Sequence, residues 1–300
     1  MTAPLAAPTL AVDSRCELGE CVLWDERRGA LFWTDITSAR LWMHRPDSGS
    51  TRNWQLPDRL GCFALCEDGR LLLGLAKGLS LFDPDADAAT VQHVADVEPE
   101  RDDTRLNDGR CDRHGNFVFG TKNERDSKAS GGYYQFSFAR GLRQLALPAA
   151  AIPNSICFSH DGGTMYFCDS RVPEILCCDY EPASATVSDV RRFIRVDTAD
   201  ASPDGSVVDA EGCLWNAQWG AARVVRYRPD GGIDRVVPVP AKNPSCCSFG
   251  GVDFDQLYIS TAREDMGADE LARMPYAGGI YRVASSDVCG LPENRLAGAA

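Results

Sequence analysis

The sequence predicts an all-β fold, and three observations lead to that prediction. A short unit recurs along the chain: an apolar strand, a turn containing Asp and usually Gly, and a second apolar strand, as in a β-hairpin. The copies are spaced by about 40 to 50 residues, the period of a four-stranded propeller blade. Six such blades account for the whole chain, so we expect residues 1–300 to form a single six-bladed β-propeller domain. The copies lie at residues 24–33, 65–73, 111–119, 158–167, 207–215 and 252–259.

The fifth copy shows the unit most clearly. Val207-Val208 and Cys213-Leu214-Trp215 predict two short strands, joined by a turn at residues 209–212 that ends in Gly. Just before the first strand, Pro203-Asp204-Gly205 predicts a tight turn. We therefore expect the Asp204 carboxylate at the mouth of the hairpin rather than in its body.

The two ends of the chain are expected to meet in one blade. Residues 10–13 (Leu-Ala-Val-Asp) predict a closing strand, and residues 279–283 predict the final strand of the last blade. Joining the first segment to the last blade closes the propeller and hides the strand edges that an open array would expose.

Composition limits the possible partners and the compartment. Hydrophobic residues make up 44% of the chain and charged residues 25%, as in ordinary globular proteins. The net charge is −12 and no block of Lys and Arg interrupts it, so nucleic acid and anionic membranes would be repelled. No apolar stretch approaches about 18 residues, and the first twelve residues lack the basic start of a secretory signal. We expect a cytoplasmic protein that is a monomer or a weak homodimer.

The chain has 13 cysteines, among them the adjacent pairs Cys177-Cys178 and Cys246-Cys247. Neighbouring residues of a strand point to opposite faces, which suits small buried hydrophobic side chains better than metal ligands. No paired C-x-x-C element is present. We therefore expect reduced, mostly buried thiols rather than a disulfide framework or a zinc site.

Acid or amide side chains precede the first strand of four of the six copies: Glu20, Asn107, Asn154 and Asp204. Taken singly, each is typical of a turn or of a solvated surface. Equivalent strand starts of successive propeller blades converge on one end of the central channel, so their common register predicts a shared site. None of the four histidines has this register, which argues against a Ser-His-Asp arrangement and a His-based metal site.

Glu20, Asn154 and Asp204 together offer two carboxylates and an amide oxygen. Such hard donors suit a divalent cation such as Ca²⁺, Mn²⁺ or Mg²⁺ better than a thiolate-seeking metal. A cation can polarise a carbonyl and lower the pKa of water, as attack on an ester or a lactone requires. Asp204 can also serve as a general base, and Arg105 and Asn107 offer donors for substrate hydroxyls or for an oxyanion.

The sequence resembles the family of senescence marker protein 30 (regucalcin), gluconolactonases and bacterial sugar lactonases. The resemblance implies a six-bladed propeller with one catalytic divalent metal held by Glu20, Asn154 and Asp204, with Asp204 doubling as the base. It also implies that Arg105 and Asn107 contact the substrate, and it leaves the metal open among calcium, zinc, manganese, iron and magnesium. The matching motifs are Leu18-Gly19-Glu20, Arg105-Leu106-Asn107-Asp108-Gly109, Gly120-Thr121, Pro153-Asn154-Ser155, Pro203-Asp204-Gly205, Asp209-Ala210-Glu211-Gly212-Cys213-Leu214-Trp215, Phe249-Gly250-Gly251, Thr261-Ala262-Arg263 and Ala277-Gly278-Gly279-Ile280.

Some family members carry an acid a few residues after the Gly-Thr pair that binds substrate. Here the segment reads Lys122-Asn123-Glu124-Arg125, a more basic version, so the sugar specificity of the animal proteins is not expected to carry over. We predict a metal-dependent hydrolase that opens a sugar 1,4- or 1,5-lactone, such as L-arabinono-, xylono-, galactono- or gluconolactone, to the aldonic acid. Two alternatives stay open: an esterase or organophosphate hydrolase on the same fold, and a non-catalytic calcium-binding propeller.

Overall fold

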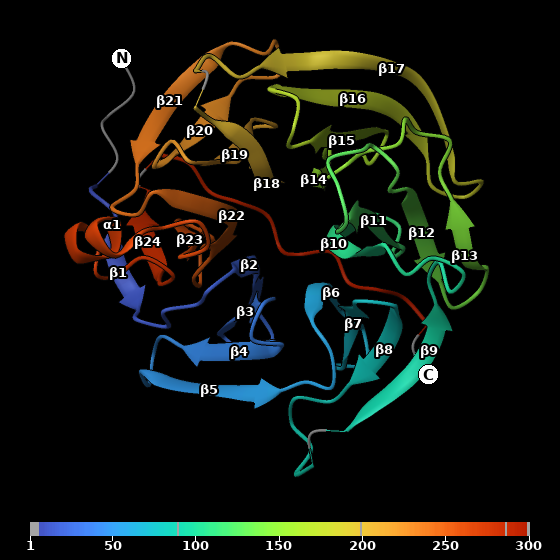
Figure 1. Ribbon diagram of the computed structural model, residues 1–300, viewed down its shortest axis with the longest axis horizontal. Helices are drawn as coiled ribbons and strands as arrows, with labels where there is room; N and C mark the ends of the chain where they lie inside the picture. The colour runs from blue at the N-terminus through green and yellow to red at the C-terminus, as the bar shows by residue number, and fades with distance from the viewer. Residues whose placement is uncertain (1–5, 89, 199, 286, 299–300) are drawn as a thin grey trace. The chain divides into compact units, whose positions relative to one another are not determined.

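The computed structural model describes residues 6–88, 90–198, 200–285 and 287–298. Within these residues the strands form six antiparallel sheets of four strands each (Figure 1). Each sheet contains one of the six predicted hairpins. The chain divides into two compact units, one from residues 1–54 and 196–292 and the other from residues 55–195 and 293–300.

The first unit holds three of these sheets. In one of them the N-terminal strand pairs antiparallel with the last strand of the chain, with Leu10 opposite Tyr281. The predicted closing strand is therefore confirmed, and it begins one residue earlier than expected (Figure 1). The strands of this unit are β1 (Thr9–Val12), β2 (Gly19–Asp25), β3 (Ala30–Asp35), β4 (Arg40–Arg45), β5 (Ser50–Gln55), β18 (Ser202–Val208), β19 (Leu214–Trp219), β20 (Arg223–Tyr227), β21 (Ile233–Pro238), β22 (Asn243–Gly250), β23 (Gln256–Ala262) and β24 (Ile280–Ala284).

Large aromatic side chains fill the space between neighbouring sheets of the first unit. Trp24 of β2 stacks on Tyr258 of β23 with ring centroids 5.9 Å apart, and Trp215 of β19 meets Phe249 of β22 edge-on at 5.6 Å. Burying such rings is among the largest single contributions to core stability. The apolar alternation that predicted the strands thus becomes the contact surface between sheets.

The second unit holds the other three sheets and ends with the C-terminal segment. The Leu296 N–H donates to the Leu65 carbonyl, and the Leu296 carbonyl accepts the N–H of Glu67, so this segment adds backbone hydrogen bonds at the end of a strand. The strands are β6 (Leu60–Leu65), β7 (Leu71–Leu75), β8 (Gly78–Phe82), β9 (Val91–Asp96), β10 (Thr104–Cys111), β11 (Phe117–Asn123), β12 (Tyr133–Ser137), β13 (Gly141–Gln144), β14 (Pro153–Phe158), β15 (Thr164–Asp169), β16 (Glu174–Glu181) and β17 (Thr186–Arg195).

The sixth hairpin departs from its predicted position. The hairpin predicted at residues 252–259 would place its first strand at residues 252–254, but β22 ends at Gly250 and these residues form the turn to β23. Gly251 has a φ of +88°, a conformation that glycine adopts without strain and that turns the chain away from the sheet. Val252 is consequently 91% exposed.

A short helix, α1 (Ala268–Arg273), lies in the connection from β23 to β24 and was not predicted. Leu271 packs against the core of the first unit together with Met266 and Met274. The Glu270 carboxylate accepts the Gly267 N–H at the start of the helix. The helix therefore packs on the core of the first unit without altering the all-β class.

The cysteines behave as the sequence predicts. All 13 lie within the described residues, where none forms a disulfide, and all are buried except Cys289. Burial raises the pKa of the Cys16 and Cys66 thiols to about 12 and that of Cys213 to about 11. These thiols are therefore protonated and unreactive near neutral pH.

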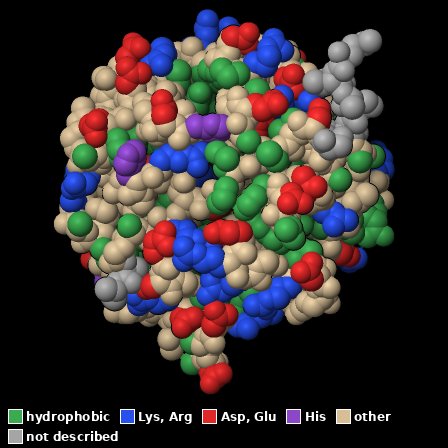
Figure 2. All heavy atoms as spheres, turned by 180° about the vertical axis from the view of Figure 1, so that it is seen from behind, with side chains coloured by type: hydrophobic (Ala, Val, Ile, Leu, Met, Phe, Trp, Pro, Cys, Tyr) green, Lys and Arg blue, Asp and Glu red, His purple; other side chains and the backbone are tan. Residues whose placement is uncertain are grey.

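Charged side chains of both signs are interspersed over the face seen in Figure 2. This distribution agrees with the absence of a Lys and Arg block in the sequence. None of the described helical segments has the length and apolarity needed to span a lipid bilayer. Residues 1–5, which belong to the segment assessed above as a possible leader, lie outside the described residues.

Candidate functional site

Each acid or amide residue of the predicted site lies in the first strand of its sheet, next to an interruption in the strand pairing. Pairing with the second strand is antiparallel on both sides of the interruption, and the register shifts between them, as in a β-bulge. The shifts fall between Glu20 and Leu23 in β2, Leu106 and Gly109 in β10, Asn154 and Cys157 in β14, and Pro203 and Ser206 in β18. Bulges re-aim side chains and are frequent beside active sites, so the shared register seen in the sequence has a structural counterpart.

Asp204 lies within β18, so the predicted tight turn before the strand is wrong. The strand pairs with β19 on both sides of the bulge, which keeps the segment in the sheet. The Asn216 side chain donates to the Asp204 carbonyl at 2.9 Å and to the Ser206 hydroxyl at 3.0 Å. The amide thus supplies a hydrogen bond to a backbone carbonyl that the bulge removes from the strand pairing. Asp204 itself is 4% exposed.

The residues directly after Glu20 and Asn154 have positive φ although neither is glycine. The φ of Cys21 is 49° and that of Ser155 is 60°. This left-handed conformation costs roughly 1–2 kcal/mol for a residue with a side chain. The Cys21 N–H donates to Glu20 Oε2 at 3.2 Å, which helps to fix the half-buried carboxylate. The sequence carries no signal for this conformation, because Gly and Asn are the residues that normally mark it.

Within the first unit, β22 lies between the strands that carry Glu20 and Asp204. The Ser245 hydroxyl donates to the carbonyl of Gly19, directly before Glu20. The backbone directly after Asp204 comes so close to Cys246 that a Cβ there would lie 2.7 Å from its sulfur. Ser245 and Cys246, which are consecutive in β22, therefore contact the two segments that carry Glu20 and Asp204.

In the second unit, Arg105, Asn107 and Asn154 form a hydrogen-bonded series. Arg105 Nη1 donates to Asn107 Oδ1 at 2.9 Å, and Asn107 Nδ2 donates to Asn154 Oδ1 at 3.2 Å. Asn154 Nδ2 in turn donates to the Ser170 hydroxyl at 2.8 Å, so the orientation of this buried amide is determined at both ends. An amide oxygen has two lone pairs, so Asn154 Oδ1 can accept from Asn107 and also bind a cation.

Glu124 is a member of this cluster that the sequence analysis did not assign. Its Oε1 accepts the Arg105 Nε–H at 3.2 Å, while both its oxygens accept from Arg59, at 2.5 and 2.8 Å. Partial burial alone would raise the pKa of Glu124, but the Arg59 hydrogen bond and the charges of Arg105, Arg59 and Lys122 lower it overall. The single acid of residues 122–125, the segment expected to be more basic, thus binds Arg105. Arg59 lies 65 residues away in the chain, so spacing gives no hint of the pair.

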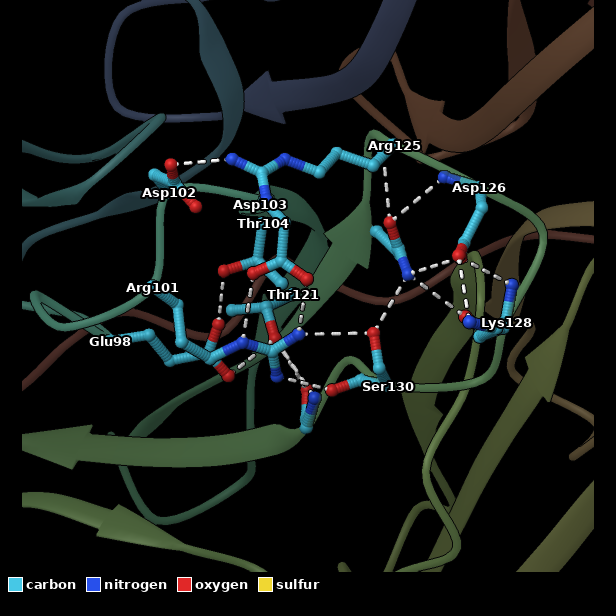
Figure 3. Close-up of polar contacts among 12 residues, drawn as sticks. Glu98, Arg101, Asp102, Asp103, Thr104, Thr121, Arg125, Asp126, Lys128 and Ser130 are labelled. Carbon is cyan, nitrogen blue, oxygen red and sulfur yellow. Dashed lines mark hydrogen bonds and ion pairs between the residues drawn. The ribbon is translucent and has the colours of Figure 1, made fainter.

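The segment that carries Glu124 is held by partly buried polar contacts (Figure 3). Asn123 Oδ1 accepts the N–H groups two and three residues later, and its Nδ2 donates to Asp126 at 2.9 Å and to Ser130 at 2.8 Å. Arg101 also donates to the Ser130 hydroxyl, at 3.0 Å. Figure 3 shows Ser130 beside Arg101. The loop after β11 is therefore ordered by its neighbours.

A pocket of about 270 Å³ lies beside this loop, lined in part by Glu98, Arg101, Ser130 and Tyr134. Glu98 accepts hydrogen bonds from the hydroxyls of Thr104, Thr121 and Tyr134. Three hydroxyl donors satisfy a buried carboxylate well. Glu98 therefore ties the segment before β10 to strands β10, β11 and β12.

Comparison with known proteins identifies the family. Residues 18–263 match the family described as SMP-30/Gluconolactonase/LRE-like region. This chain belongs to that family. The resemblance seen in its motifs is thereby confirmed, and each of the five predicted site residues lies within the matched span.

Two relatives in this SMP-30/gluconolactonase family are described as lactonases. The chain is 48% identical to the L-arabinolactonase of Azospirillum brasilense over 298 residues, covering 98% of this chain and 97% of the relative. It is 33% identical to the 6-deoxy-6-sulfogluconolactonase of Pseudomonas putida, covering 88% of this chain and 90% of the relative. Each alignment covers more than four fifths of both chains.

A solved structure of the family supports the fold. The calcium-binding protein regucalcin from Agrobacterium tumefaciens strain C58 matches with a TM-score of 0.91 at 29% identity, covering 99% of both chains. With the six four-stranded sheets, this match confirms the predicted fold class, a six-bladed β-propeller of four-stranded blades.

Proposed function

We propose that this chain is a hydrolase that opens a sugar lactone to its aldonic acid. The near full-length similarity to the L-arabinolactonase of Azospirillum brasilense carries the proposal. A buried hydrogen-bonded series of Arg105, Asn107 and Asn154 supports it, since such groups can position a hydroxylated substrate. L-Arabinono-lactone is the first substrate to test, followed by xylono-, galactono- and gluconolactone.

We also propose that Glu20, Asn154 and Asp204 hold one divalent cation. The donor chemistry fits, because two carboxylates and an oriented amide oxygen are hard oxygen ligands. Among the described residues, no group of three or more His, Cys, Asp and Glu side chains could hold a metal ion. The proposed set is of a different kind, because its third ligand is the Asn154 amide. The description of the Agrobacterium tumefaciens regucalcin as calcium-binding also supports a divalent cation.

The proposed reaction adds water across the ring ester. The water oxygen bonds to the carbonyl carbon, the bond from that carbon to the ring oxygen breaks, and a proton ends on the ring oxygen as a hydroxyl. We assign to Asp204 the removal of the proton from water and its return to the ring oxygen. A bound divalent cation supplies polarisation of the carbonyl and a lowered pKa of water.

Arg105 and Asn107 are the proposed substrate-contacting residues. Both are buried, and Arg105 Nη1 is held by the Leu106 carbonyl at 2.8 Å as well as by Asn107. A side chain held before substrate arrives loses little further entropy on binding, which favours affinity. We expect these residues to contact substrate hydroxyls or the developing oxyanion.

The test is a screen of aldonolactones with a pH indicator, using metal-stripped protein resupplied with single cations. We expect activity on at least one pentonolactone, loss of that activity on chelation, and an unchanged far-ultraviolet circular dichroism spectrum. Higher activity on aryl esters or phosphoesters than on every lactone would favour the esterase or organophosphate hydrolase alternative. Calcium binding without turnover of any lactone would favour a non-catalytic propeller.

A further inference from the structure

A continuous series of hydrogen bonds leads from Arg59 through Glu124 to Arg105. We propose that Arg59 is a positioning residue, which fixes the Arg105 guanidinium through Glu124 without contacting the substrate itself. This inference rests on the proposed function, because it assigns Arg105 to the substrate site. It adds a residue from a segment in which none of the site motifs lies.

The geometry of the first pair is that of a clamp. Arg59 Nη1 donates to Glu124 Oε1 at 2.5 Å and Nη2 donates to Oε2 at 2.8 Å, so two parallel hydrogen bonds fix the plane of the carboxylate. Oε1 also accepts the Arg105 Nε–H. The orientation that Arg59 gives to the carboxylate therefore sets the position of the acceptor for Arg105.

The three side chains come from three different places in the second unit. Arg59 directly precedes β6, Arg105 is the second residue of β10, and Glu124 directly follows β11. The Glu124 N–H donates to the Asp103 carbonyl, and the preceding Asn123 fixes the loop through its own side chain. The backbone of Glu124 is thus held independently of Arg59, and the clamp determines only its side chain.

The exposure of the pair argues against a main role in folding. The side chains of Arg59 and Glu124 are 40% and 28% exposed, so solvent screens much of what the pair contributes to stability. Arg226 shows the contrast, because it is 3% exposed and binds three carboxylates in the first unit. Removing Arg59 should therefore leave the fold intact while it releases Glu124.

We expect the loss of Arg59 to weaken substrate binding. In Arg59→Ala the Glu124 carboxylate can rotate, so the Arg105 Nε–H loses its oriented acceptor while Nη1 stays bonded to Leu106 and Asn107, and the guanidinium is less firmly oriented. If Arg105 binds the ground state and the transition state alike, KM rises and kcat changes little. We expect KM to rise about 5- to 10-fold, less than the roughly 100-fold that misplacement of a catalytic group can cause.

The experiment is a double-mutant cycle of Arg59→Ala and Arg105→Ala with lactone kinetics at saturating cation. Arg191→Ala is the matched control, because Arg191 is 43% exposed and pairs with two carboxylates in the outer strands of one sheet. We expect Arg59→Ala to lower kcat/KM in the wild type and to change it by less than about 2-fold in Arg105→Ala, since groups that act through one another are not additive. Arg191→Ala should match the wild type.

An equal loss in both backgrounds, or no loss in the wild type, would overturn the proposal. Normal kinetics of Arg105→Ala would instead contradict the role of Arg105 in the proposed function. A crystal structure of Arg59→Ala separates the two questions without any assay. Arg105 Nε still within hydrogen-bond distance of an unmoved Glu124 would exclude positioning by Arg59, and a displaced pair would support it.

Discussion

At the scale of single residues, the site is defined by side chains that are held before any ligand arrives. Asn154 is bonded at both ends of its amide, by Asn107 and by Ser170. A side chain ordered in this way has already lost its rotamer freedom during folding, so binding a cation need not supply that cost again. The same argument applies to Arg105, which is fixed by Asn107 and Glu124.

Asp204→Asn tests the dual role proposed for Asp204. The substitution keeps an oxygen donor and nearly the same shape but removes the negative charge and the basicity. We expect kcat to fall by at least about 100-fold even in saturating cation. Bound metal and lactone kinetics are measured on the same samples. Near-normal kcat with full metal content would mean that another group takes the proton.

Arg105→Ala and Asn107→Ala are the matched controls for that measurement. Both remove donors to the substrate and leave Glu20, Asn154 and Asp204 unchanged, so metal content should persist while kcat/KM falls. Loss of metal from Asn107→Ala would indicate that its bond to Asn154 is needed to orient the amide.

Glu124 makes a prediction about pH. Burial acts to raise its pKa, but Arg59, Arg105 and Lys122 outweigh burial and lower it. The folded state therefore favours the carboxylate, so the pair's stabilisation is fully present above the unfolded pKa of about 4.3 and is lost as the pH falls through the lower folded pKa. In Arg59→Ala the pKa of Glu124 should rise. Carboxyl ¹³C NMR titration measures it, with Glu124→Gln giving the assignment and Arg191→Ala expected to leave it unchanged.

The sequence predicted which residues could form the site but not what holds them. Glu20, Asn154 and Asp204 stand out because they share one register in successive repeats. Their roles stay predictions until metal and kinetics are measured. Arg59 and Ser170 could not be predicted, since side-chain pairing between distant segments leaves no local pattern in a single sequence.

At the scale of elements, close packing explains why the sheet that begins with β6 has glycine rather than an acid or amide at its register shift. Its first strand, β6, has Gly61 at the corresponding position, next to a register shift between Leu60 and Cys62. A Cβ on Gly61 would lie 2.9 Å from the carbonyl oxygen of Asn107 and closer still to that of Leu106. Only glycine lets β6 approach the strand that carries the substrate-contacting residues.

Gly61→Ala should therefore be destabilising. The added methyl meets backbone carbonyls of β10, which cannot rotate away, and overpacking of this kind costs roughly 1–3 kcal/mol. Gly163→Ala is the control, because the nearest atom to its Cβ is 3.6 Å away, on an exposed Asp161 side chain. Urea unfolding at equilibrium measures both. Equal midpoints for the two variants would show that β6 and β10 can separate without cost.

Strand positions were predictable because alternation and turn residues are local signals. The hairpins of the first five copies appear where the sequence placed them. The turn predicted at Pro203-Asp204-Gly205 was wrong because this tripeptide is a turn signal on its own, whereas pairing with β19 keeps Asp204 in the sheet. The helix α1 gave no signal, since six residues are too few for a helical period to stand out.

At the scale of the whole molecule, the fold class, the family and the lactonase class predicted from the sequence are confirmed. The repeat determined the fold class because every sheet is built from the same hairpin. The expected monomer or weak homodimer, the absence of nucleic-acid and membrane partners, and the cytoplasmic location stay predictions from composition. So does the interpretation of residues 1–300 as a single domain.

That interpretation predicts a single unfolding transition. Neither compact unit is a continuous piece of chain, because the first needs residues 1–54 and 196–292 and the second needs residues 55–195 and 293–300. In the sequence, each unit is therefore interrupted by or separated from its own remainder by residues of the other unit. This arrangement favours cooperative folding of both. Chains of this length often unfold through intermediates, so coincidence of different probes is the decisive observation.

The tryptophans provide a probe of one unit. All six, at positions 24, 33, 42, 54, 215 and 219, belong to the first unit, so their fluorescence follows that unit, whereas far-ultraviolet circular dichroism follows the strands of both. Pulse alkylation of buried Cys66 and Cys111 reports on the second unit. We expect the three urea curves to share one midpoint. Alkylation of Cys66 and Cys111 at urea concentrations where tryptophan fluorescence is still native would show that the units unfold separately, and the chain would then have two domains.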